Sequence, residues 1–372
     1  MVNERIARSA MRGVPNTLSC EPSKSLARVG HGANRAGAGT QLSFARAAWN
    51  ENSVGRMSNK SFVLAKTLAA AWMALLTSGA SAQPQTSALE QVKTWAYQLK
   101  DVSQEKIDKI VASPFDMIIV DSSMFPNGKE VRLTREQVES MKRKPDGSRR
   151  LVVAYFSAGE CESFRHYWKP EWNKNRPSWV YKADHDWKGD YIVRYWDPAW
   201  HKIIYGTADS LIDNILAAGF DGISIDRVDA YYYFGDTEAR RRQMIELIKE
   251  ISTYMRARKP DSVILAQNAE ELLDHPDYIS AIDGIAKEDL LFGISHKERR
   301  NPQGDIEHST RLLDSARKMD KVIFVIEYLK NKANIAEARR YMKEHDFVLY
   351  VGQRDLYELS GVVGEGEAPA AK

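Results

Sequence analysis

Eight short apolar segments recur along this chain, separated by longer stretches, and no other feature of the sequence restricts the fold as strongly. The short segments are almost continuous runs of Val, Ile and other apolar residues. Such runs are typical of parallel strands that are covered on both faces. We expect strands at residues 95–99, 117–121, 151–156, 222–226, 263–267, 284–288, 322–327 and 347–351.

Amphipathic segments with helical spacing lie between these runs. Alternating strands and helices predict an α/β fold, and eight repeats predict a (β/α)8 TIM-type barrel. We place the barrel in one domain, residues 83–360. A doubly wound sheet is the alternative architecture. The main expected helices are residues 104–112, 203–218, 239–258, 309–319 and 335–345.

Residues 57–82 have the layout of a secretory signal peptide. A basic start and an apolar centre are followed by a small-residue cleavage site, Ala80-Ser81-Ala82, before Gln83. A membrane anchor or a buried helix is the alternative, but an apolar run of about ten residues is short for a bilayer. We therefore expect a secreted or periplasmic protein without a membrane span in the mature chain.

Residues 1–56 and 361–372 are not expected to belong to the barrel. The first segment is rich in Arg, Ala, Gly and Ser without sustained periodicity, and we interpret it as a misassigned extension upstream of Met57. A long presequence is the alternative. The C-terminal segment is small and polar, and we expect it to be disordered.

The net charge of the mature chain gives no sign of a nucleic-acid partner. Ten of the 53 basic and three of the 50 acidic residues lie in residues 1–82, so the rest carries about −4. One cysteine, Cys161, remains, and we expect it to be an inert buried thiol and not a nucleophile. The histidines lack ligand spacing, so we predict no metal, and no cofactor motif is present.

The loop after the third expected strand is long and carries six of the nine tryptophans. One interpretation is a packed subdomain with its own small core. The other is a wall on which sugar rings stack, because an indole suits the apolar face of a pyranose. We expect different tryptophans to serve each role, with Trp196 among the sugar contacts.

Carboxylates follow several of the expected strands. Asp121, Asp226, Glu288 and Glu327 end strands, and Asp229 lies just beyond one. A barrel gathers such strand ends around one rim, where enzymes of this fold keep their catalytic groups. Glycoside hydrolysis requires two carboxyl groups, one protonated and one ionised. Each acid could instead cap a helix or form a salt bridge.

Three ordered motifs resemble glycoside hydrolase family 114, the endo-α-1,4-polygalactosaminidase-like proteins, and its bacterial branch. They are AYFSAGECESFR at 154–165, GFDGISIDRVDAY at 219–231 and QNAEEL at 267–272. The resemblance covers roughly residues 93–355. It implies a TIM-type barrel that hydrolyses galactosamine-containing polysaccharide with retention of configuration.

The resemblance also implies roles for individual residues. Asp226 matches the family's nucleophile, and Glu288 matches its acid/base, although the residues around Glu288 differ from the fungal pattern. Further acids would offset the charge of a cationic hexosamine polymer. The expected substrate contacts are Asp121, Tyr155, Glu162, Arg165, Trp196, Asp229, Tyr231, Asn268 and Glu327.

Two other functions use the same residues differently. A non-catalytic carbohydrate-binding barrel would keep the aromatic groups but lack a convergent pair of acids. A nucleotide-handling enzyme is a weaker alternative, because no phosphate-binding glycine loop is present. Neither the oligomeric state nor the acetylation preference follows from the sequence.

Overall fold

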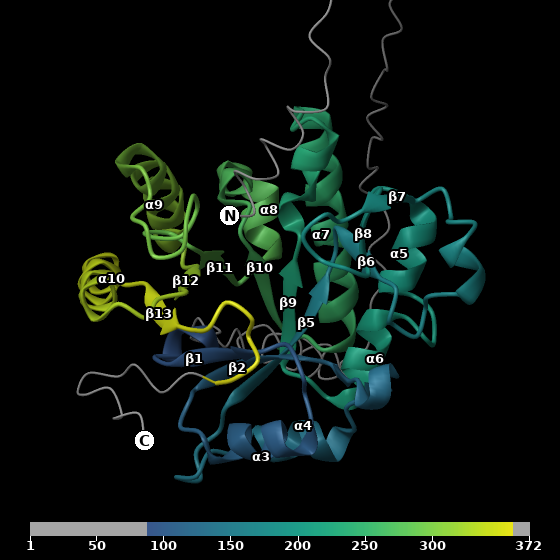
Figure 1. Ribbon diagram of the computed structural model, residues 1–372, viewed down its shortest axis with the longest axis horizontal. Coiled ribbons are helices and arrows are strands. Elements are labelled where there is room, and N and C mark those ends of the chain that lie inside the picture. The colour runs from purple at the N-terminus through teal and green to yellow at the C-terminus, as the bar shows by residue number, and fades with distance from the viewer. Residues whose placement is uncertain (1–87, 360–372) are drawn as a thin grey trace, which may run out of the picture. The chain divides into compact units, whose positions relative to one another are not determined.

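The computed structural model describes residues 88–359, so the predictions for residues 1–56, 57–82 and 361–372 lie outside the described residues. Eight parallel strands form the central sheet, in the order β1-β2-β5-β9-β10-β11-β12-β13 (Figure 1). Each strand is joined to the next by a crossover, as the (β/α)8 prediction requires. The strands are β1 (Trp95–Gln98), β2 (Met117–Asp121), β5 (Leu151–Ser157), β9 (Gly222–Asp226), β10 (Val263–Gln267), β11 (Gly284–Glu288), β12 (Val322–Glu327) and β13 (Val348–Val351).

The first and last strands meet at a seam that nearly closes the barrel. No backbone ladder joins β1 to β13, but the indole N–H of Trp95 donates to the carbonyl of Val348 at 2.9 Å. Trp95 also packs edge-on against Phe324, with ring centroids 5.3 Å apart, and contacts Tyr350. Large aromatic side chains therefore fill the barrel interior and connect its first strand to its last.

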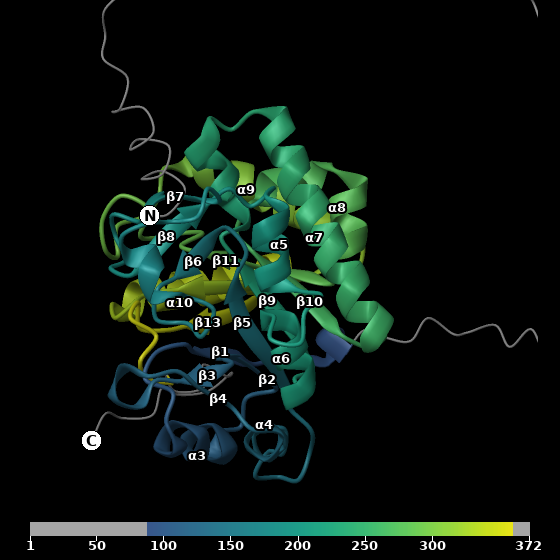
Figure 2. The same ribbon diagram turned by 90° about the vertical axis from the view of Figure 1, so that its right-hand side faces the viewer.

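Helices cover the outside of the strands, and α7 lies beside α8 in both views (Figure 1, Figure 2). Their buried faces are apolar, as in Met244, Ile248 and Ile251 of α7. This amphipathic pattern is what the strand–helix alternation predicted. The helices are α3 (Gln104–Ala112), α4 (Arg135–Met141), α5 (Pro198–Ile204), α6 (Leu211–Ala218), α7 (Glu238–Arg258), α8 (Pro276–Ala281), α9 (Gln303–Arg317) and α10 (Lys332–His345).

The expected helix 203–218 is wrong in its first half, because the chain turns after α5 and a separate helix, α6, begins at Leu211. Gly206 in this turn has φ +89°, a conformation that ends a helix readily because glycine has no Cβ. Three short helices, α4, α5 and α8, were not anticipated, apart from the last two residues of α5. For α4 a signal existed, since Thr134 and Gln137 form a capping box.

The tryptophan-rich loop folds into a small antiparallel sheet, with strands in the order β6-β8-β7. This sheet follows the end of β5 (Figure 1). Most of its tryptophans pack on one another or on neighbouring rings, as Trp179 does on Trp200 at 5.1 Å between centroids. The subdomain interpretation therefore describes most of this loop. Its strands are β6 (Glu160–Glu162), β7 (Val180–Ala183) and β8 (Asp190–Val193); a hairpin of β3 (Ser123–Met124) and β4 (Val131–Arg132) follows β2.

Candidate active site

Asp226 and Glu288 end β9 and β11 at the same rim of the barrel, with β10 between them. Both side chains are partly exposed, as are Tyr155 and Tyr328, whereas the residues before each of them are buried. Solvent therefore reaches the rim at these four side chains. The negative charge of Glu288 acts on Asp226, so the two acids share one electrostatic environment.

Tyr155 and Arg227 hold Asp226. The Tyr155 hydroxyl donates to Asp226 Oδ2 at 2.7 Å, and the Arg227 backbone N–H donates to Oδ1 at 2.7 Å. Burial raises the pKa of Asp226, and the charge of Glu288 adds to the rise, while Arg227 opposes it. The surroundings of Asp226 thus drive it toward its protonated form.

Three donors converge on the carboxylate of Glu288. The side-chain amides of Gln267 and Asn268 donate to Oε2 at 2.9 and 3.0 Å, and the Tyr328 hydroxyl donates to Oε1. Asn268 Oδ1 in turn accepts from the Glu288 backbone N–H at 3.0 Å. These contacts fix the direction in which the carboxylate points.

Tyr97 lies beneath the pair and joins it to the barrel interior. Its hydroxyl donates to Gln267 Oε1 at 2.7 Å. Burial raises its pKa, and the charges of Glu288 and Asp226 raise it further. Tyr97 therefore remains a neutral donor, and it orients the amide that binds Glu288.

A left-handed residue follows each of the three strands that carry this site. Arg227, Asn268 and Asp289 have φ of 57°, 56° and 53°. This region is costly for residues other than glycine, so other contacts must hold it. Arg227 pairs with Glu160 at 2.9 Å.

Asp289 is held by a bidentate pair with Arg354, at 2.9 and 2.7 Å. The Arg354 guanidinium also lies 4.3 Å from the ring centroid of Tyr328, which donates to Glu288. Gly293 leaves room for this pair, since a Cβ there would lie 2.5 Å from Asp289 Oδ1. Arg354, in the segment after β13, thus supports the Glu288 side of the site.

Some predicted substrate contacts lie beside the acid pair. Tyr155 and Asn268 bond directly to Asp226 and Glu288. Asp229 is buried just behind Asp226, and its Oδ2 has no hydrogen-bond partner. Burial raises the pKa of Asp229 to about 7, and the charge of Asp226 adds to the rise against the effect of Arg227.

The other predicted contacts are occupied by the protein itself. Asp121 and Arg165 form a buried bidentate pair at 2.7 and 2.8 Å, and Arg165 also binds Glu162 at 2.6 Å. The Arg240 guanidinium covers the Trp196 ring at 3.7 Å. We therefore leave this group out of the proposed site.

Tyr231 and Glu327 are fully buried, so we leave both out of the proposed site as well. The carboxylate of Glu327 accepts the backbone N–H groups of Leu291 and Phe292 at 2.7 and 3.3 Å. It supports the loop after β11 and does not face the pair.

Three side chains of the site were missed by sequence reasoning: Tyr97, Gln267 and Tyr328. The alternation of side chains along a strand could have found two of them, because side chains two residues apart point to the same face. Tyr97 shares the face of Trp95. Tyr328 likewise continues the inward face of Phe324 and Ile326.

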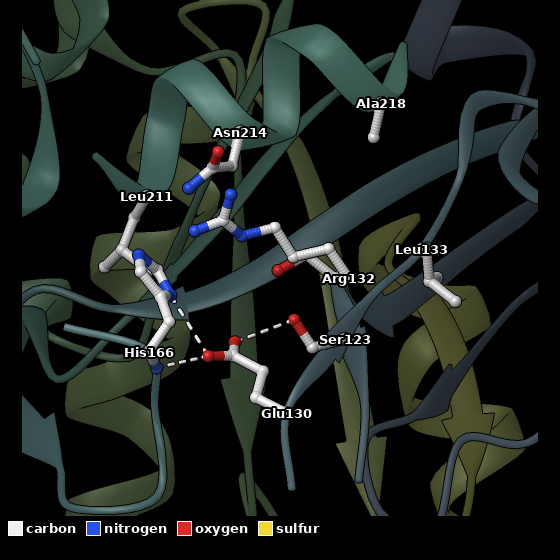
Figure 3. Close-up of a pocket in the computed structure, with 9 residues that line it drawn as sticks. Ser123, Glu130, Arg132, Leu133, His166, Leu211, Asn214 and Ala218 are labelled. Carbon is white, nitrogen blue, oxygen red and sulfur yellow. Dashed lines mark hydrogen bonds and ion pairs between the residues drawn. The ribbon is translucent and has the colours of Figure 1, made fainter. Parts of the chain in front are cut away.

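A small hollow lies between the β3–β4 hairpin and α6, away from the acid pair (Figure 3). Glu130 lines it, accepting from Ser123 at 2.8 Å and contacting His166 Nδ1 at 3.0 Å. Burial would raise the pKa of Glu130, but the bonds from His166 and Ser123 lower it to about 2. Its polar groups are satisfied internally, and we assign it no ligand.

Metal and thiol chemistry receive no support from the described residues. Within residues 88–359, no group of three or more His, Cys, Asp or Glu side chains is arranged to hold a metal ion. Cys161 is fully buried, and burial raises the pKa of its thiol well above the usual value. In the same part of the chain, no helix has the length and apolarity needed to cross a membrane.

Comparison with known proteins links this geometry to a family. Residues 76–367 match the model of glycoside-hydrolase family GH114. An uncharacterised protein of Methanocaldococcus jannaschii is 33% identical over 286 residues, 72% of this chain and 78% of that protein. One of Deinococcus radiodurans is 31% identical over 278 residues, covering 73% and 84%.

Two solved structures share the barrel fold. The glycoside hydrolase domain of PelA from Pseudomonas aeruginosa matches with a TM-score of 0.54 at 17% identity, covering 72% of this chain and 97% of that domain. Ega3 from Aspergillus fumigatus, solved with galactosamine, matches with a TM-score of 0.50 at 17% identity, covering 71% and 93%. At this identity the likeness establishes the TIM-type architecture.

Proposed function

The chain is a glycoside hydrolase of family GH114, and we propose that it cleaves α-1,4-linked galactosamine-containing polysaccharide with retention of configuration. The observation that carries this proposal is the pair Asp226 and Glu288, two solvent-reached acids on one rim, where the charge of Glu288 acts on Asp226. The galactosamine bound to Ega3 supports the choice of sugar.

In this mechanism Asp226 attacks the anomeric carbon and forms a glycosyl-enzyme intermediate. Glu288 protonates the departing glycosidic oxygen and then removes a proton from the water that releases the sugar. Tyr155 donates to the nucleophile and stabilises its charge when the intermediate breaks down. Asn268, Gln267 and Tyr328 aim the carboxyl group of Glu288.

The electrostatics of Asp226 in the free enzyme suit an acid/base better than a nucleophile. Burial and the charge of Glu288 raise the pKa of Asp226, against the effect of Arg227 and of the bond from Tyr155. The raised pKa of Asp226 therefore supports a second assignment, in which Glu288 is the nucleophile and Asp226 is the acid/base. The experiment must distinguish the two assignments.

We expect Asp226→Asn to lower kcat by about 10⁴-fold or more, because the covalent step is lost. We expect Glu288→Gln to lower it by about 10²–10⁴-fold on polymer. On an aryl galactosaminide with an activated leaving group, Glu288→Gln should retain its first step, since little protonation is needed. Asp305→Asn and Glu307→Gln on the exposed face of α9 are the matched controls.

Azide can replace a missing carboxylate, and the configuration of the glycosyl azide product shows which role that carboxylate had. Alanine at position 226 or 288 leaves room for the azide ion. Azide should rescue Glu288→Ala with a retained glycosyl azide and Asp226→Ala with an inverted one. The reverse pattern would exchange the roles. Polymer binding by the wild type without any product would favour the non-catalytic carbohydrate-binding barrel.

We also propose that the protein is exported by the signal peptide at residues 57–82 and acts outside the cytoplasm. A polysaccharide substrate of this size is met there.

A further inference from the structure

One tryptophan of the six in the β6–β8 region does not pack into the subdomain. Trp187 lies in the turn between β7 and β8 and is 41% exposed. Its ring contacts the Lys100 ammonium, 4.2 Å from the ring centroid. The same ammonium lies 5.9 Å from the ring centroid of Tyr357, which is 45% exposed. Two open aromatic rings therefore flank one cation.

The β7–β8 turn spans the mouth of the barrel. At the base of this turn, Asp184 pairs with Arg227 at 3.2 Å, and Arg227 directly follows Asp226 on β9. At its tip, Trp187 meets Lys100, which follows β1, near Tyr357, which follows β13. In the strand order β9 and β13 stand four places apart, on opposite sides of an eight-stranded ring. The turn therefore begins beside Asp226 and places Trp187 on the opposite side of the barrel mouth.

Exposed aromatic rings at the mouth of a glycosidase barrel offer the apolar face on which a pyranose stacks. They also attract cations through their π faces, but here Lys100 already occupies that position. A sugar stacked on the Trp187 ring would lie close to the Lys100 ammonium. An unacetylated hexosamine carries an ammonium group of its own, which Lys100 would repel. The centre of the site has the opposite charge, with Asp226 and Glu288.

We propose that Trp187 and Tyr357 form an outlying sugar subsite, and that Lys100 between them selects an uncharged, N-acetylated hexosamine over one with a free ammonium group. This inference rests on the proposed function and adds to it a charge pattern along the substrate. The acids at the centre receive the cationic sugar, and the outlying subsite receives an acetylated one. The enzyme then cuts best in polymers that contain both.

Trp187→Ala tests the stacking platform. We expect its kcat/KM on partly acetylated galactosamine polymer to fall about 5–10-fold, while kcat/KM on a single-sugar aryl galactosaminide is unchanged, because that substrate does not reach the outlying subsite. The control is Tyr181→Ala, whose ring is 44% exposed on β7 and packs on Phe234 instead. Equal losses on both substrates, or no loss on polymer, would overturn the proposal.

Lys100→Gln tests the charge selection. We expect this variant to cleave fully deacetylated polymer about 3–10-fold better relative to partly acetylated polymer, with Lys182→Gln, beside Tyr181, as the control. An unchanged preference would overturn the selection by Lys100. If the wild type cleaves neither polymer nor aryl galactosaminide, the proposed function fails. If it cleaves both and the variants match it, the outlying subsite alone fails.

Discussion

Neighbouring residues at the end of β12 show how strand parity separates structural from catalytic groups. Phe324 and Ile326 face the barrel interior, so Glu327 faces outward, and Tyr328 returns to the inside, where it reaches Glu288. The carboxyl group of Glu327 is consequently buried against the loop after β11. Burial raises its pKa to about 8, with the charge of Asp289 adding to the rise against the backbone N–H groups of Leu291 and Phe292.

This raised pKa predicts a pH dependence of stability. The ordinary glutamate value of 4.5 holds in the unfolded chain, so between pH 4.5 and about 8 the folded protein binds more protons. The contribution of Glu327 to the free energy of unfolding should therefore fall as pH rises through this window, by at most about 1.4 kcal/mol per pH unit. Glu327→Gln should remove this fall.

Urea denaturation of Glu327→Gln and wild type at pH 5 and pH 8 measures the effect. The variant should gain stability relative to wild type at pH 8, and Glu307→Gln on the exposed face of α9 should follow wild type at both pH values. A difference between Glu327→Gln and wild type that is the same at both pH values would contradict the raised pKa.

At the scale of elements, the seam between β1 and β13 is the weakest joint of the barrel. A ladder of backbone hydrogen bonds joins all the remaining neighbouring pairs of its strands, whereas here the indole of Trp95 supplies a bond to Val348. Trp95 is fully buried among Tyr97, Phe324 and Tyr350. Just beyond the strands, the backbone N–H groups of Leu99 and Lys100 donate to the Leu356 carbonyl at 3.3 Å, so closure combines this side chain with a few backbone bonds.

We expect Trp95→Phe to lower the free energy of unfolding by about 2–4 kcal/mol, because it removes the hydrogen bond to the half-buried Val348 and opens a small cavity. Trp196→Phe is the matched control. Its ring is only partly buried, so its cost should be about 1 kcal/mol or less. Equal costs in chemical denaturation would contradict a special role of the seam.

The positions of the strands followed closely from the sequence. The expected segments 117–121, 222–226, 263–267, 284–288 and 322–327 have the observed bounds, because buried parallel strands are nearly uniform apolar runs. The helix expected at 203–218 failed because helical spacing continues across Gly206, and only the backbone conformation there ends the helix. The spacing of apolar residues indicates which face of a helix is buried, but it does not indicate where a turn interrupts the helix.

The site was harder to anticipate than the fold. A carboxylate at a strand end identified Asp226 and Glu288, but the same reasoning selected Asp121 and Glu327, which the protein uses internally. Asp121 has a buried partner, Arg165, that lies 44 residues away in the sequence. Pairings over such distances depend on the fold and cannot be deduced from one sequence.

For the molecule as a whole, the proposed export predicts where the mature chain begins. We expect Gln83 to be its first residue, whether translation starts at Met1 or at Met57. Expression in a Gram-negative host, fractionation and N-terminal sequencing measure this. Ala82→Asp should block cleavage, since the processing site requires a small residue, and Thr86→Asp, which lies beyond that site, is the control.

A full-length chain retained in the cytoplasm would contradict the export proposal and leave the barrel and its acid pair untouched. Efficient processing after Ala82 in a chain that starts at Met57, and poorer processing in one that starts at Met1, would support the interpretation of residues 1–56 as an upstream extension.

The left-handed residues behind the two acids have a consequence for transplanting this chemistry. Arg227 and Asp289 keep their conformations because Glu160 and Arg354, from distant parts of the chain, clasp them. A designer who grafts only the acidic strand ends onto another scaffold would lose these ion pairs, and the residues after the two acids would leave the left-handed conformation. Transfer of the two catalytic acids therefore also requires Glu160 and Arg354, and with them the small sheet after β5 and the segment after β13.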